Sequence, residues 1–456
     1  MKCINSLFIL LLIVLGTVIV FSSCKKFVET NIPSSQLLTP NVFVDDTTAN
    51  SAVNGLYASL SGGTSGSGLV SSVTVLTGLC ADELTYLPNA AYDDYKNNSI
   101  SPLNSNLGLV WTSCYRSIYQ ANAIMEGLNT STGVSPAKKS QFRGEALFAR
   151  AYCYFLLAQL YGDAPLQLTT DVNVNKTMAR TDRQLVMAQV KADLLQAKDL
   201  LPANYSISNN ERVRANKYVA AALLARYYLY TGNWQDAATQ ASELIGASTM
   251  FSLLTDLNAV FLKNSQEAIW QFWEPNGYTP EAFLILPTGG STPNYVVTPN
   301  LLAAFAPGDL RAAAWLKPVQ TYYCPYKYKI ANATSGNEYH MLLRLAEQYL
   351  IRAEARAHLQ DFAGAKADLN AIRSRAGLAA SSASDEATLL QAVEAERQRE
   401  LFSENGHRWF DLIRTGRANA VLGAVKGAFW QPTDVLFPIP QKEIGLNSRL
   451  TQNPGY

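Results

Sequence analysis

The chain has 456 residues, of which 48% are hydrophobic and 16% are charged, and its formal net charge is +1. This length suffices for one large domain or two ordinary domains with a substantial core. Near-neutral charge argues against nucleic-acid binding, which requires a basic face, and against long-range steering of charged substrates. With only 3 His and no Cys-x-x-Cys spacing, the sequence predicts no metal site and no cofactor.

An apolar run over residues 7–21 dominates the amino-terminal end. It follows one basic residue, Lys2, and ends in Ser22-Ser23-Cys24. A short basic start, an apolar stretch and small residues before a cleavage point are typical of a secretory signal. A cysteine at that point is typical of a bacterial lipoprotein, because its thiol can take a diacylglyceryl group and its freed amine an acyl chain such as palmitate.

Lipidation of Cys24 would fix the protein to a membrane. At about 0.8 kcal/mol for each buried CH₂, two or three acyl chains hold a protein there almost permanently. We therefore expect residues 1–23 to be a cleaved signal and residues 24–40 a lipidated tether. An uncleaved anchor helix is the alternative, since the apolar run is nearly long enough to span a bilayer.

The remaining sequence has mostly helical patterns. Ser135-Pro136 offers an N-cap followed by proline at the first helical position, and Gly162 offers a left-handed stop. The Gly/Ser-rich segment 61–68 lacks the endings of a phosphate loop and of a nucleophile elbow, so we expect a simple loop. Helices are predicted over residues 45–60, 107–128, 141–161, 183–200 and 213–230.

One pattern occurs twice, over residues 223–237 and 351–365. Each copy has a helical segment, a tight turn with Asn233 or Asp361, an aromatic residue, and a second helical segment with small residues. This order is typical of a tetratricopeptide helical hairpin. The sequence thus predicts a mainly α fold built from such hairpins.

Residues 251–333 interrupt the helical pattern. They are rich in Pro, Gly, Asn, Tyr and Trp, and short strands are plausible over 268–273 and 322–330. A long irregular stretch in a compact protein is usually functional or disordered, and the many aromatic residues argue against disorder.

The segment 394–417 is dense in charge, which could indicate an acid–base centre. Its charges are spaced three apart, however, as neighbours on a helix are. We expect structural ion pairs that hold two short helices on either side of Asn405-Gly406. The predicted pairs are Glu396/Arg399, Arg397/Glu400 and Asp411/Arg414.

Two acidic pairs, Asp82-Glu83 and Asp93-Asp94, have three interpretations. They could be glycosidase carboxylates, a Ca²⁺ site or solvated turn residues. Without a third acidic group at the spacing of a calcium loop, we expect solvated turn residues.

Four cysteines, Cys80, Cys114, Cys153 and Cys324, remain in the mature chain. Cys114 and Cys153 lie among apolar helical residues, which favours buried thiols, although an oxidising compartment also permits a disulfide.

Aromatic residues supply the candidate binding site. Most of the 23 Tyr and 7 Trp are expected in the core. Flat rings beside amides and carboxylates nevertheless suit sugars, because a ring covers the C–H face of a pyranose while the polar groups bind its hydroxyls. The segment 78–99 and the irregular region both combine these types. The candidate ligand-binding residues are Tyr86, Asn89, Tyr92, Asp94, Tyr95, Trp273, Tyr278 and Trp315.

Several segments occur in an order that is typical of one family. They cover residues 50–57, 144–152, 160–165, 343–347, 353–355, 368–377, 396–401 and 408–414, followed by Phe437-Pro438-Ile439-Pro440 and 452–456. Together they resemble the SusD/RagB family of outer-membrane nutrient-binding lipoproteins from Bacteroidota, over nearly the whole mature chain.

The resemblance implies a single domain over residues 41–456, with an N-terminal part to about 240 and a C-terminal part from about 260. It implies four tetratricopeptide-like pairs, with loops and small strands forming the ligand face. It also implies a non-catalytic protein on the cell exterior that captures glycans or peptides and delivers them to a TonB-dependent transporter of the SusC type.

Two other functions compete with glycan capture. An extracytoplasmic glycosidase would use Asp82, Glu83, Asp93 or Asp94 as its carboxylates. A purely structural adaptor would bind the transporter and no ligand. The sequence offers no clear catalytic constellation for the first, and the aromatic-rich irregular region disfavours the second.

Overall fold

The structure, a computed structural model, describes residues 42–456 except 63–68, 288 and 334. The predicted signal, Cys24 and the tether lie outside the described residues. The described chain is mainly helical, as predicted, with three short two-stranded sheets. Among the described residues, no helix combines the length and apolarity that crossing a membrane requires.

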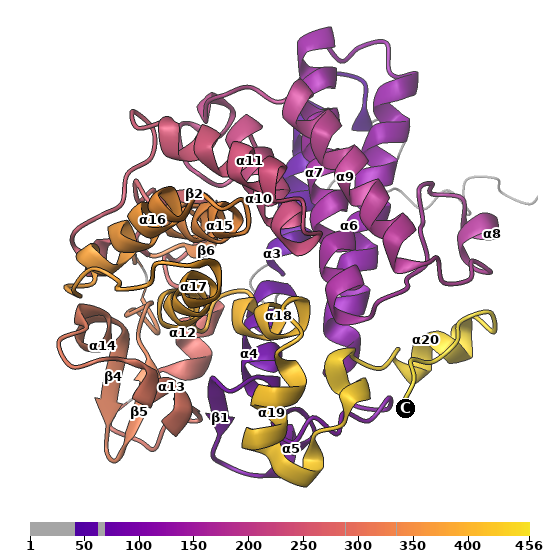
Figure 1. Ribbon diagram of the computed structural model, residues 1–456. Helices are drawn as coiled ribbons and strands as arrows, with labels where there is room; N and C mark the ends of the chain where they lie inside the picture. Colours follow the sequence, from indigo (N-terminus) through magenta and orange to yellow (C-terminus); the bar gives the residue numbers. More distant parts are fainter. Residues whose placement is uncertain (1–41, 63–68, 288, 334) are drawn as a thin grey trace, which may run out of the picture.

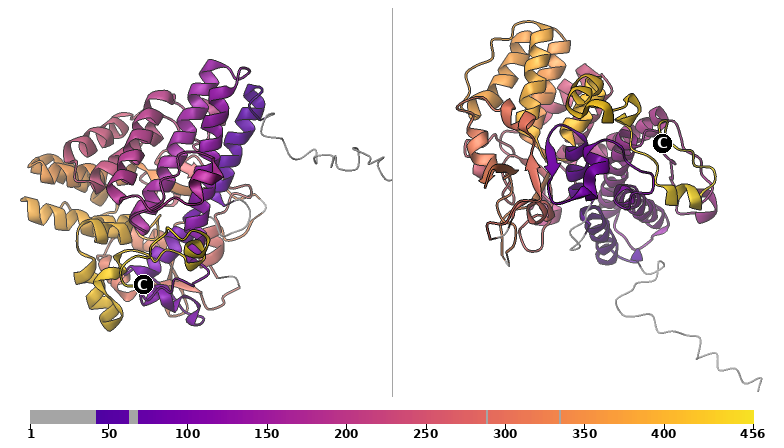
Figure 2. Two further views of the ribbon diagram at one scale, coloured as in Figure 1. Left: turned by 90° about the vertical axis from the view of Figure 1, so that its right-hand side faces the viewer. Right: turned by 90° about the horizontal axis from the view of Figure 1, so that it is seen from below.

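Long helices packed against their neighbours in chain order form the framework (Figures 1 and 2). Each contacts the next along the row from α6 to α15, and α15 contacts both α16 and α17. The framework helices are α3 (Asp46–Ser61), α6 (Leu107–Thr130), α7 (Pro136–Leu160), α9 (Arg183–Leu200), α10 (Lys217–Tyr230), α11 (Trp234–Gly246), α15 (Leu345–His358), α16 (Phe362–Arg375) and α17 (Glu386–Leu401).

Several helix ends follow the capping signals in the sequence, although Ser135 and Asn233 occupy N-cap positions without a side-chain capping hydrogen bond. The Asp45 side chain accepts a hydrogen bond from the backbone N–H of Thr48, and Pro136 occupies the first turn of α7. Gly162 has φ +73°, the left-handed conformation expected after a helix. The predicted start at residue 213 is wrong, because Asn216 caps α10 and the helix begins at Lys217.

The two repeats are helical hairpins, as predicted. Helix α10 packs on α11, and α15 packs on α16. The Asp361 side chain caps α16 by accepting from the N–H of Gly364 at 2.9 Å. Trp234, at the start of α11, stacks on His358 of α15, with ring centroids 3.9 Å apart and planes 17° apart. The aromatic residue of the first repeat thus fills the space beside the second.

Short elements make up the rest of the described chain, and many of them, such as α13, α19 and β5, lie in the lower part of the molecule in Figure 1. The helices are α4 (Leu69–Cys80), α5 (Asp93–Lys96), α8 (Val172–Asn175), α12 (Pro280–Ile285), α13 (Pro299–Ala304), α14 (Leu310–Trp315), α18 (His407–Arg414), α19 (Ala418–Lys426) and α20 (Gln441–Leu446). The strand pairs are β1 (Leu84–Tyr86) with β3 (Tyr295–Val297), β2 (Ala268–Phe272) with β6 (His340–Arg344), and β4 (Leu316–Val319) with β5 (Tyr322–Pro325).

Two predictions about these elements need correction. Helix α4 was not predicted; its sequence is rich in Val and Thr, which favour strands, and packing against α6 holds it helical. The strand predicted over 322–330 ends at Pro325, because β4 offers only four residues for pairing. The strand predicted over 268–273 is confirmed as β2.

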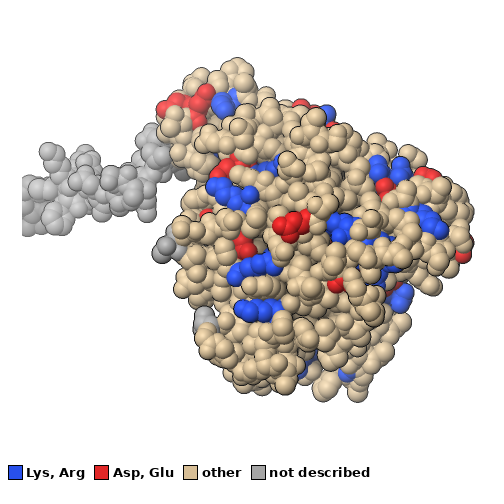
Figure 3. Space-filling view, turned by 90° about the vertical axis from the view of Figure 1, so that its left-hand side faces the viewer, with Lys and Arg blue, Asp and Glu red and all other residues tan. Residues whose placement is uncertain are grey.

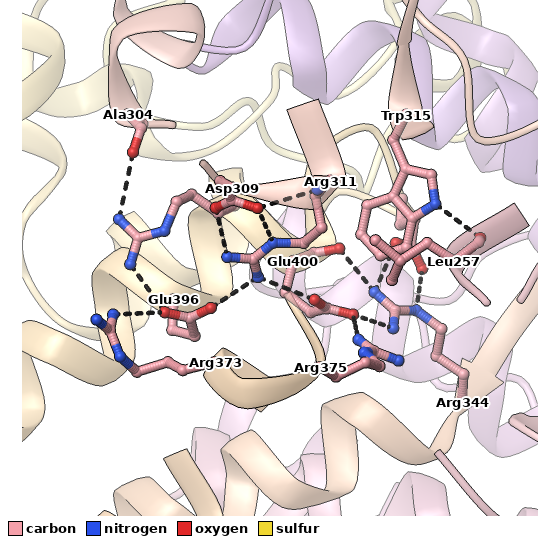
Figure 4. A network of polar contacts seen from close by, with 12 residues as sticks. Leu257, Ala304, Asp309, Arg311, Trp315, Arg344, Arg373, Arg375, Glu396 and Glu400 are labelled. Atoms are coloured by element: carbon pink, nitrogen blue, oxygen red, sulfur yellow. Dashed lines mark hydrogen bonds and ion pairs between the residues drawn. The ribbon is translucent and has the colours of Figure 1, made fainter. Parts of the chain in front are cut away.

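A buried ion network, shown in Figure 4, ties the C-terminal part together. Glu400 is fully buried and binds the guanidinium groups of Arg311, Arg344 and Arg375. The predicted Arg397/Glu400 pair is therefore wrong, and Arg397 donates to Asp411 instead at 2.7 Å. The other two predicted pairs, Glu396/Arg399 and Asp411/Arg414, are confirmed at 2.9 and 2.8 Å.

The described cysteines are reduced and buried, and the surface charge on one face is mixed, as the near-neutral net charge of the chain suggests. Cys80, Cys114, Cys153 and Cys324 are buried free thiols, which confirms the interpretation favoured for Cys114 and Cys153. On the face shown in Figure 3, acidic and basic side chains are scattered among uncharged residues. This face presents no broad patch of one sign.

Candidate functional site

Three tyrosines from separate elements form a cluster that we call the tyrosine face: Tyr86, Tyr92 and Tyr295. The ring centroids of Tyr86 and Tyr92 lie 4.8 Å apart, those of Tyr86 and Tyr295 4.9 Å, and those of Tyr92 and Tyr295 5.9 Å. Tyr86 and Tyr92 are half-buried, whereas Tyr295 is only 4% exposed and lies beneath them. The structure therefore brings two predicted ligand residues together on a third ring.

Local pairing explains why these rings meet. The antiparallel register of β1 and β3 places Tyr86 opposite Tyr295, and the Leu87 N–H donates to the carbonyl of Asn294 at 2.9 Å. The chain then turns at Asn89, whose side-chain oxygen accepts from the N–H of Ala91 and caps a short 3₁₀ helix, Ala90–Tyr92. That turn folds Tyr92 back over Tyr86.

A neighbouring hairpin extends the aromatic surface. Strand β5 lies against β3, and its Tyr322 and Tyr323 are 37% and 38% exposed. The hydroxyl of Thr292 donates to the side-chain oxygen of Gln320 at 3.3 Å, which links the turn of the hairpin to the segment before β3. The hairpin thus lies next to the strand that carries Tyr295.

The chemistry of the tyrosine face suits a neutral polyhydroxy ligand. Burial raises the pKa of Tyr295, with a further contribution from Tyr92, so its phenol stays protonated at any physiological pH. A protonated phenol both donates and accepts hydrogen bonds, and its ring offers an apolar face. The ring pairs within the cluster each contribute about 0.5–1.5 kcal/mol beyond the area they bury, which holds the rings in place.

The other predicted residues of this segment have mixed positions. Asn89 is exposed, although the N–H of Ala91 uses its oxygen. Asp94 is half-buried and accepts from the Asn104 amide at 3.1 Å. Tyr95 is 0% exposed, and its ring packs 6.0 Å from that of Phe437. Tyr95 is therefore a core residue, which corrects its selection as a ligand contact.

The predicted residues of the irregular region lie elsewhere. Trp273 is 56% exposed beside a cavity of about 610 Å³ that Asn54, Arg214 and Phe272 also line. Tyr278 is half-buried.

Trp315 corrects another prediction. It is 0% exposed, and its indole N–H donates to the carbonyl of Leu257 at 3.0 Å (Figure 4). Its ring belongs to the core, because it packs against the rings of Phe261 and Phe402 and under the ammonium group of Lys327.

The expectation of solvated turn residues is wrong for Asp82 and Glu83, which are 3% and 2% exposed. Arg408 donates to both oxygens of Asp82, at 2.7 and 2.9 Å. Burial raises the pKa of Glu83 to about 8. Asp93, by contrast, is partly exposed and pairs with Lys96 at 2.5 Å. A glycosidase mechanism would need two carboxylates facing one sugar.

Sequence reasoning did not select Tyr295, which supports both predicted rings. Strand pairing with β1 is the signal that could have found it, but β1 and β3 have three residues each, and the paired Tyr86 and Tyr295 are 209 positions apart, which leaves little pattern. Within the described residues, no group of His, Cys, Asp and Glu side chains could hold a metal ion.

Two family models match the chain. One, described as "Starch-binding associating with outer membrane", covers residues 46–229, and the other, described as "SusD family", covers residues 314–456. Among curated proteins, SusD-like protein P25 of Formosa agariphila is 26% identical over 97% of this chain and 99% of its own length. The starch-binding protein SusD of Bacteroides thetaiotaomicron is 24% identical over 72% of this chain and 75% of its own length.

Solved structures share the fold. A SusD superfamily protein from Bacteroides vulgatus aligns with a TM-score of 0.79 and 24% identity, over 91% of this chain and all of that one. A laminarin-binding SusD-like protein aligns with a TM-score of 0.76 and 24% identity, over 90% of this chain and all of that one. The helical framework, the ordered sequence segments and both family models agree, and the chain belongs to the SusD/RagB family.

Proposed function

We propose that this protein is a non-catalytic outer-membrane lipoprotein that captures an oligo- or polysaccharide at the tyrosine face. It passes the glycan to a TonB-dependent transporter of the SusC type for uptake. The observation that carries the proposal is the cluster of Tyr86, Tyr92 and Tyr295, with exposed tyrosines of β5 beside it.

The names of relatives support a glycan as the ligand class. One family model is described as starch-binding, one curated relative is a starch-binding protein, and one structural neighbour binds laminarin. Both starch and laminarin are neutral glucans, which matches a surface of rings and amides better than one of charges. Peptide capture by the same system is the alternative.

The amino-terminal sequence supports the proposed anchoring. The Ser22-Ser23-Cys24 segment after the apolar run supports a lipid on Cys24, which would hold the folded domain at the membrane. A membrane-held capture protein raises the local concentration of its ligand beside a transporter in the same membrane. Export to the outer face of that membrane is part of the proposal.

The positions of the carboxylates support binding without turnover. Asp82 is occupied by Arg408, Glu83 is buried, and Asp94 is bound to Asn104. A general acid and a second carboxylate must reach opposite sides of one glycosidic bond. Asp82, Asp93 and Asp94, three of the candidate glycosidase carboxylates, each pair with another side chain of the protein, which supports a structural role.

Affinity gel electrophoresis against a polysaccharide panel tests the proposal. The mature chain without its lipid, residues 25–456, should be retarded by at least one neutral glycan. Tyr86→Ala should weaken that retardation at least fivefold in apparent Kd, because one aromatic contact and one hydroxyl are lost. Tyr119→Ala is the matched control, since Tyr119 is a 50% exposed tyrosine of α6 away from the cluster.

Each outcome is informative. Equal retardation of Tyr86→Ala and the unsubstituted protein would contradict binding at the tyrosine face. Retardation by no glycan, together with binding of peptides, would favour the peptide alternative. Release of reducing ends from the retarding glycan would contradict a non-catalytic role.

A further inference from the structure

The cavity of about 610 Å³ beside Trp273 lies where the C-terminal half of α3 meets the end of β2 and the segment before α10. We call it the Trp273 cavity, and its walls include Asn54, Tyr57, Ala58, Phe272, Trp273 and Pro275. None of its described lining residues belongs to the tyrosine face or its neighbouring hairpin. Its volume falls within the usual range of small-molecule sites, about 300–1,000 Å³.

One side of α3 forms a wall of the cavity. The lining residues Asn54, Tyr57, Ala58 and Ser61 are spaced three and four positions apart, so they lie on one side of the helix. Asn54 and Ala58 are exposed, and the small side chain of Ala58 leaves room in front of the helix. A ligand can therefore reach this wall from solvent.

The end of β2 supplies the feature that most needs an explanation. Trp273 is 56% exposed, whereas the preceding Phe272 is only 3% exposed, and both line the cavity. Pro275 and Ala58 in the same walls are exposed as well. A group of exposed apolar side chains around a concave surface is typical of a binding site. Because Trp273 is open to solvent, a ligand in the cavity can contact it directly.

The charge of the walls favours a neutral ligand. Among the described lining residues, only Tyr57 and Arg214 can titrate. Arg214 donates to both oxygens of Glu145, at 2.7 and 2.8 Å, and to the side-chain oxygen of Asn50 at 2.7 Å. Burial raises the pKa of Tyr57, so its phenol stays protonated. The described walls thus offer no unpaired charge to an ionic ligand.

Few polar groups in the walls are left for a ligand. The hydroxyl of Tyr57 accepts from the N–H of Ala215 at 2.8 Å, and that of Ser61 donates to the carbonyl of Ala58 at 3.1 Å. The side-chain amide nitrogen of Asn54 makes no hydrogen bond with the described part of the chain. A sugar ring would place most of its hydroxyls against apolar walls, which is unfavourable without hydrogen bonds. An apolar ring avoids this cost.

We propose that the Trp273 cavity binds a neutral aromatic group, with its ring against Trp273 and a hydrogen-bond acceptor at the amide nitrogen of Asn54. Two aromatic rings in offset-stacked or edge-to-face geometry gain free energy beyond the area that they bury. Phe272 and Pro275 give the ring further apolar contacts. The single amide donor orients the ligand.

Two sources share this chemistry: the aryl group of an aryl glycoside and the aromatic side chain of an uncharged peptide. The inference does not rest on glycan capture at the tyrosine face, because it concerns other residues and another ligand class. Water alone in the cavity is the competing explanation.

Saturation-transfer NMR of the mature chain, residues 25–456, with phenyl β-glucoside and with N-acetylphenylalaninamide tests the proposal. At least one of the two compounds should bind saturably, and the compound that binds identifies the source. Its phenyl protons should receive more saturation than its other protons, because the ring enters the cavity. Methyl β-glucoside, which lacks the aromatic ring, should not displace it.

Two variants connect the binding to the cavity. Trp273→Ala should weaken the Kd of the phenyl compound about tenfold, because the ring that faces the ligand is lost. Ala58→Leu should weaken it similarly by filling the cavity from α3. Both positions are exposed, so the melting temperature should not change. Phe429→Ala is the matched control, since Phe429 is a 58% exposed aromatic residue outside the cavity.

Three results would overturn the proposal. They are failure of both phenyl compounds to bind, displacement of the bound compound by methyl β-glucoside, and a Kd that neither Trp273→Ala nor Ala58→Leu changes. Neutral-glycan retardation of the unsubstituted protein is measured separately, so a failure of this inference and a failure of glycan capture are distinguishable.

Discussion

Substitution of Glu281 by glutamine should make the protein's stability less sensitive to a rise in pH from about 4.5 to about 8. Glu281 lies in α12 and is 3% exposed. One of its oxygens accepts from the hydroxyl of Ser403 at 3.4 Å, and the other has no hydrogen bond within the described chain. Burial raises the pKa of this carboxyl from 4.5 to about 8, with a contribution from Glu404.

The size of the effect follows from these two pKa values. Between pH 4.5 and pH 8 the carboxyl is ionised in the unfolded chain and protonated in the folded one, so the unfolded chain binds fewer protons. The contribution of Glu281 to the free energy of unfolding is therefore most favourable below pH 4.5, and it is lost as the pH rises to about 8. The pKa of Glu281 is about 3.5 higher in the folded chain than in the unfolded chain. At about 1.4 kcal/mol per pH unit, this difference lowers the free energy of unfolding by about 5 kcal/mol across the window.

Urea unfolding of the unsubstituted protein and Glu281→Gln at pH 5, 7 and 9 measures this loss. An amide does not ionise, so the variant should be close to the unsubstituted protein at pH 5 and more stable by several kcal/mol at pH 9. Asp199→Asn, at an exposed position of α9, should leave the pH dependence unchanged. A difference between the unsubstituted protein and Glu281→Gln that stays constant from pH 5 to pH 9 would refute the reasoning.

Three further outcomes are expected. Arg344→Met should reduce the free energy of unfolding by about 3–5 kcal/mol in the same urea assay. The reason is that Glu267, Glu400 and Glu404 would then share one fewer cation in a buried network. A loss below about 1 kcal/mol would contradict the structural role of Arg344. Trp315→Phe should destabilise the protein by about 1–2 kcal/mol without changing glycan retardation. The phenyl ring is smaller and cannot make the buried hydrogen bond to the carbonyl of Leu257. Weaker retardation of the variant would indicate that Trp315 does contact the ligand. Replacing Cys24 by alanine should move the protein from the membrane to the soluble fraction on cell fractionation, and unchanged membrane association would contradict lipidation.

Local signals accounted for most of the long helices. The caps at Asp45 and Asp361 and the stop at Gly162 depend on neighbours within four residues, so the sequence reveals them. Helix α4 was missed because its β-branched residues favour strand locally, and only packing against α6 decides otherwise. Ion pairs on one helix, such as Glu396/Arg399, were predictable for the same local reason.

Contacts between distant segments escaped prediction. Asp82 looked solvated because its partner, Arg408, lies 326 positions away. Tyr95 and Trp315 looked like surface rings because irregular segments carry no periodicity that separates core from surface. Tyr86 and Tyr92 were correctly grouped by composition, yet Tyr295, which supports them, comes from a short strand far along the chain.

Calorimetric titration of the retarding glycan into the unsubstituted protein and the double variant Tyr86→Ala/Tyr92→Ala tests the central claim most directly. Product analysis of each titrated sample completes the measurement. The account predicts saturable binding by the unsubstituted protein with no new reducing ends, and loss of measurable binding in the double variant at an unchanged melting temperature. Equal affinities of the two proteins, or hydrolysis of the glycan, would contradict capture at the tyrosine face.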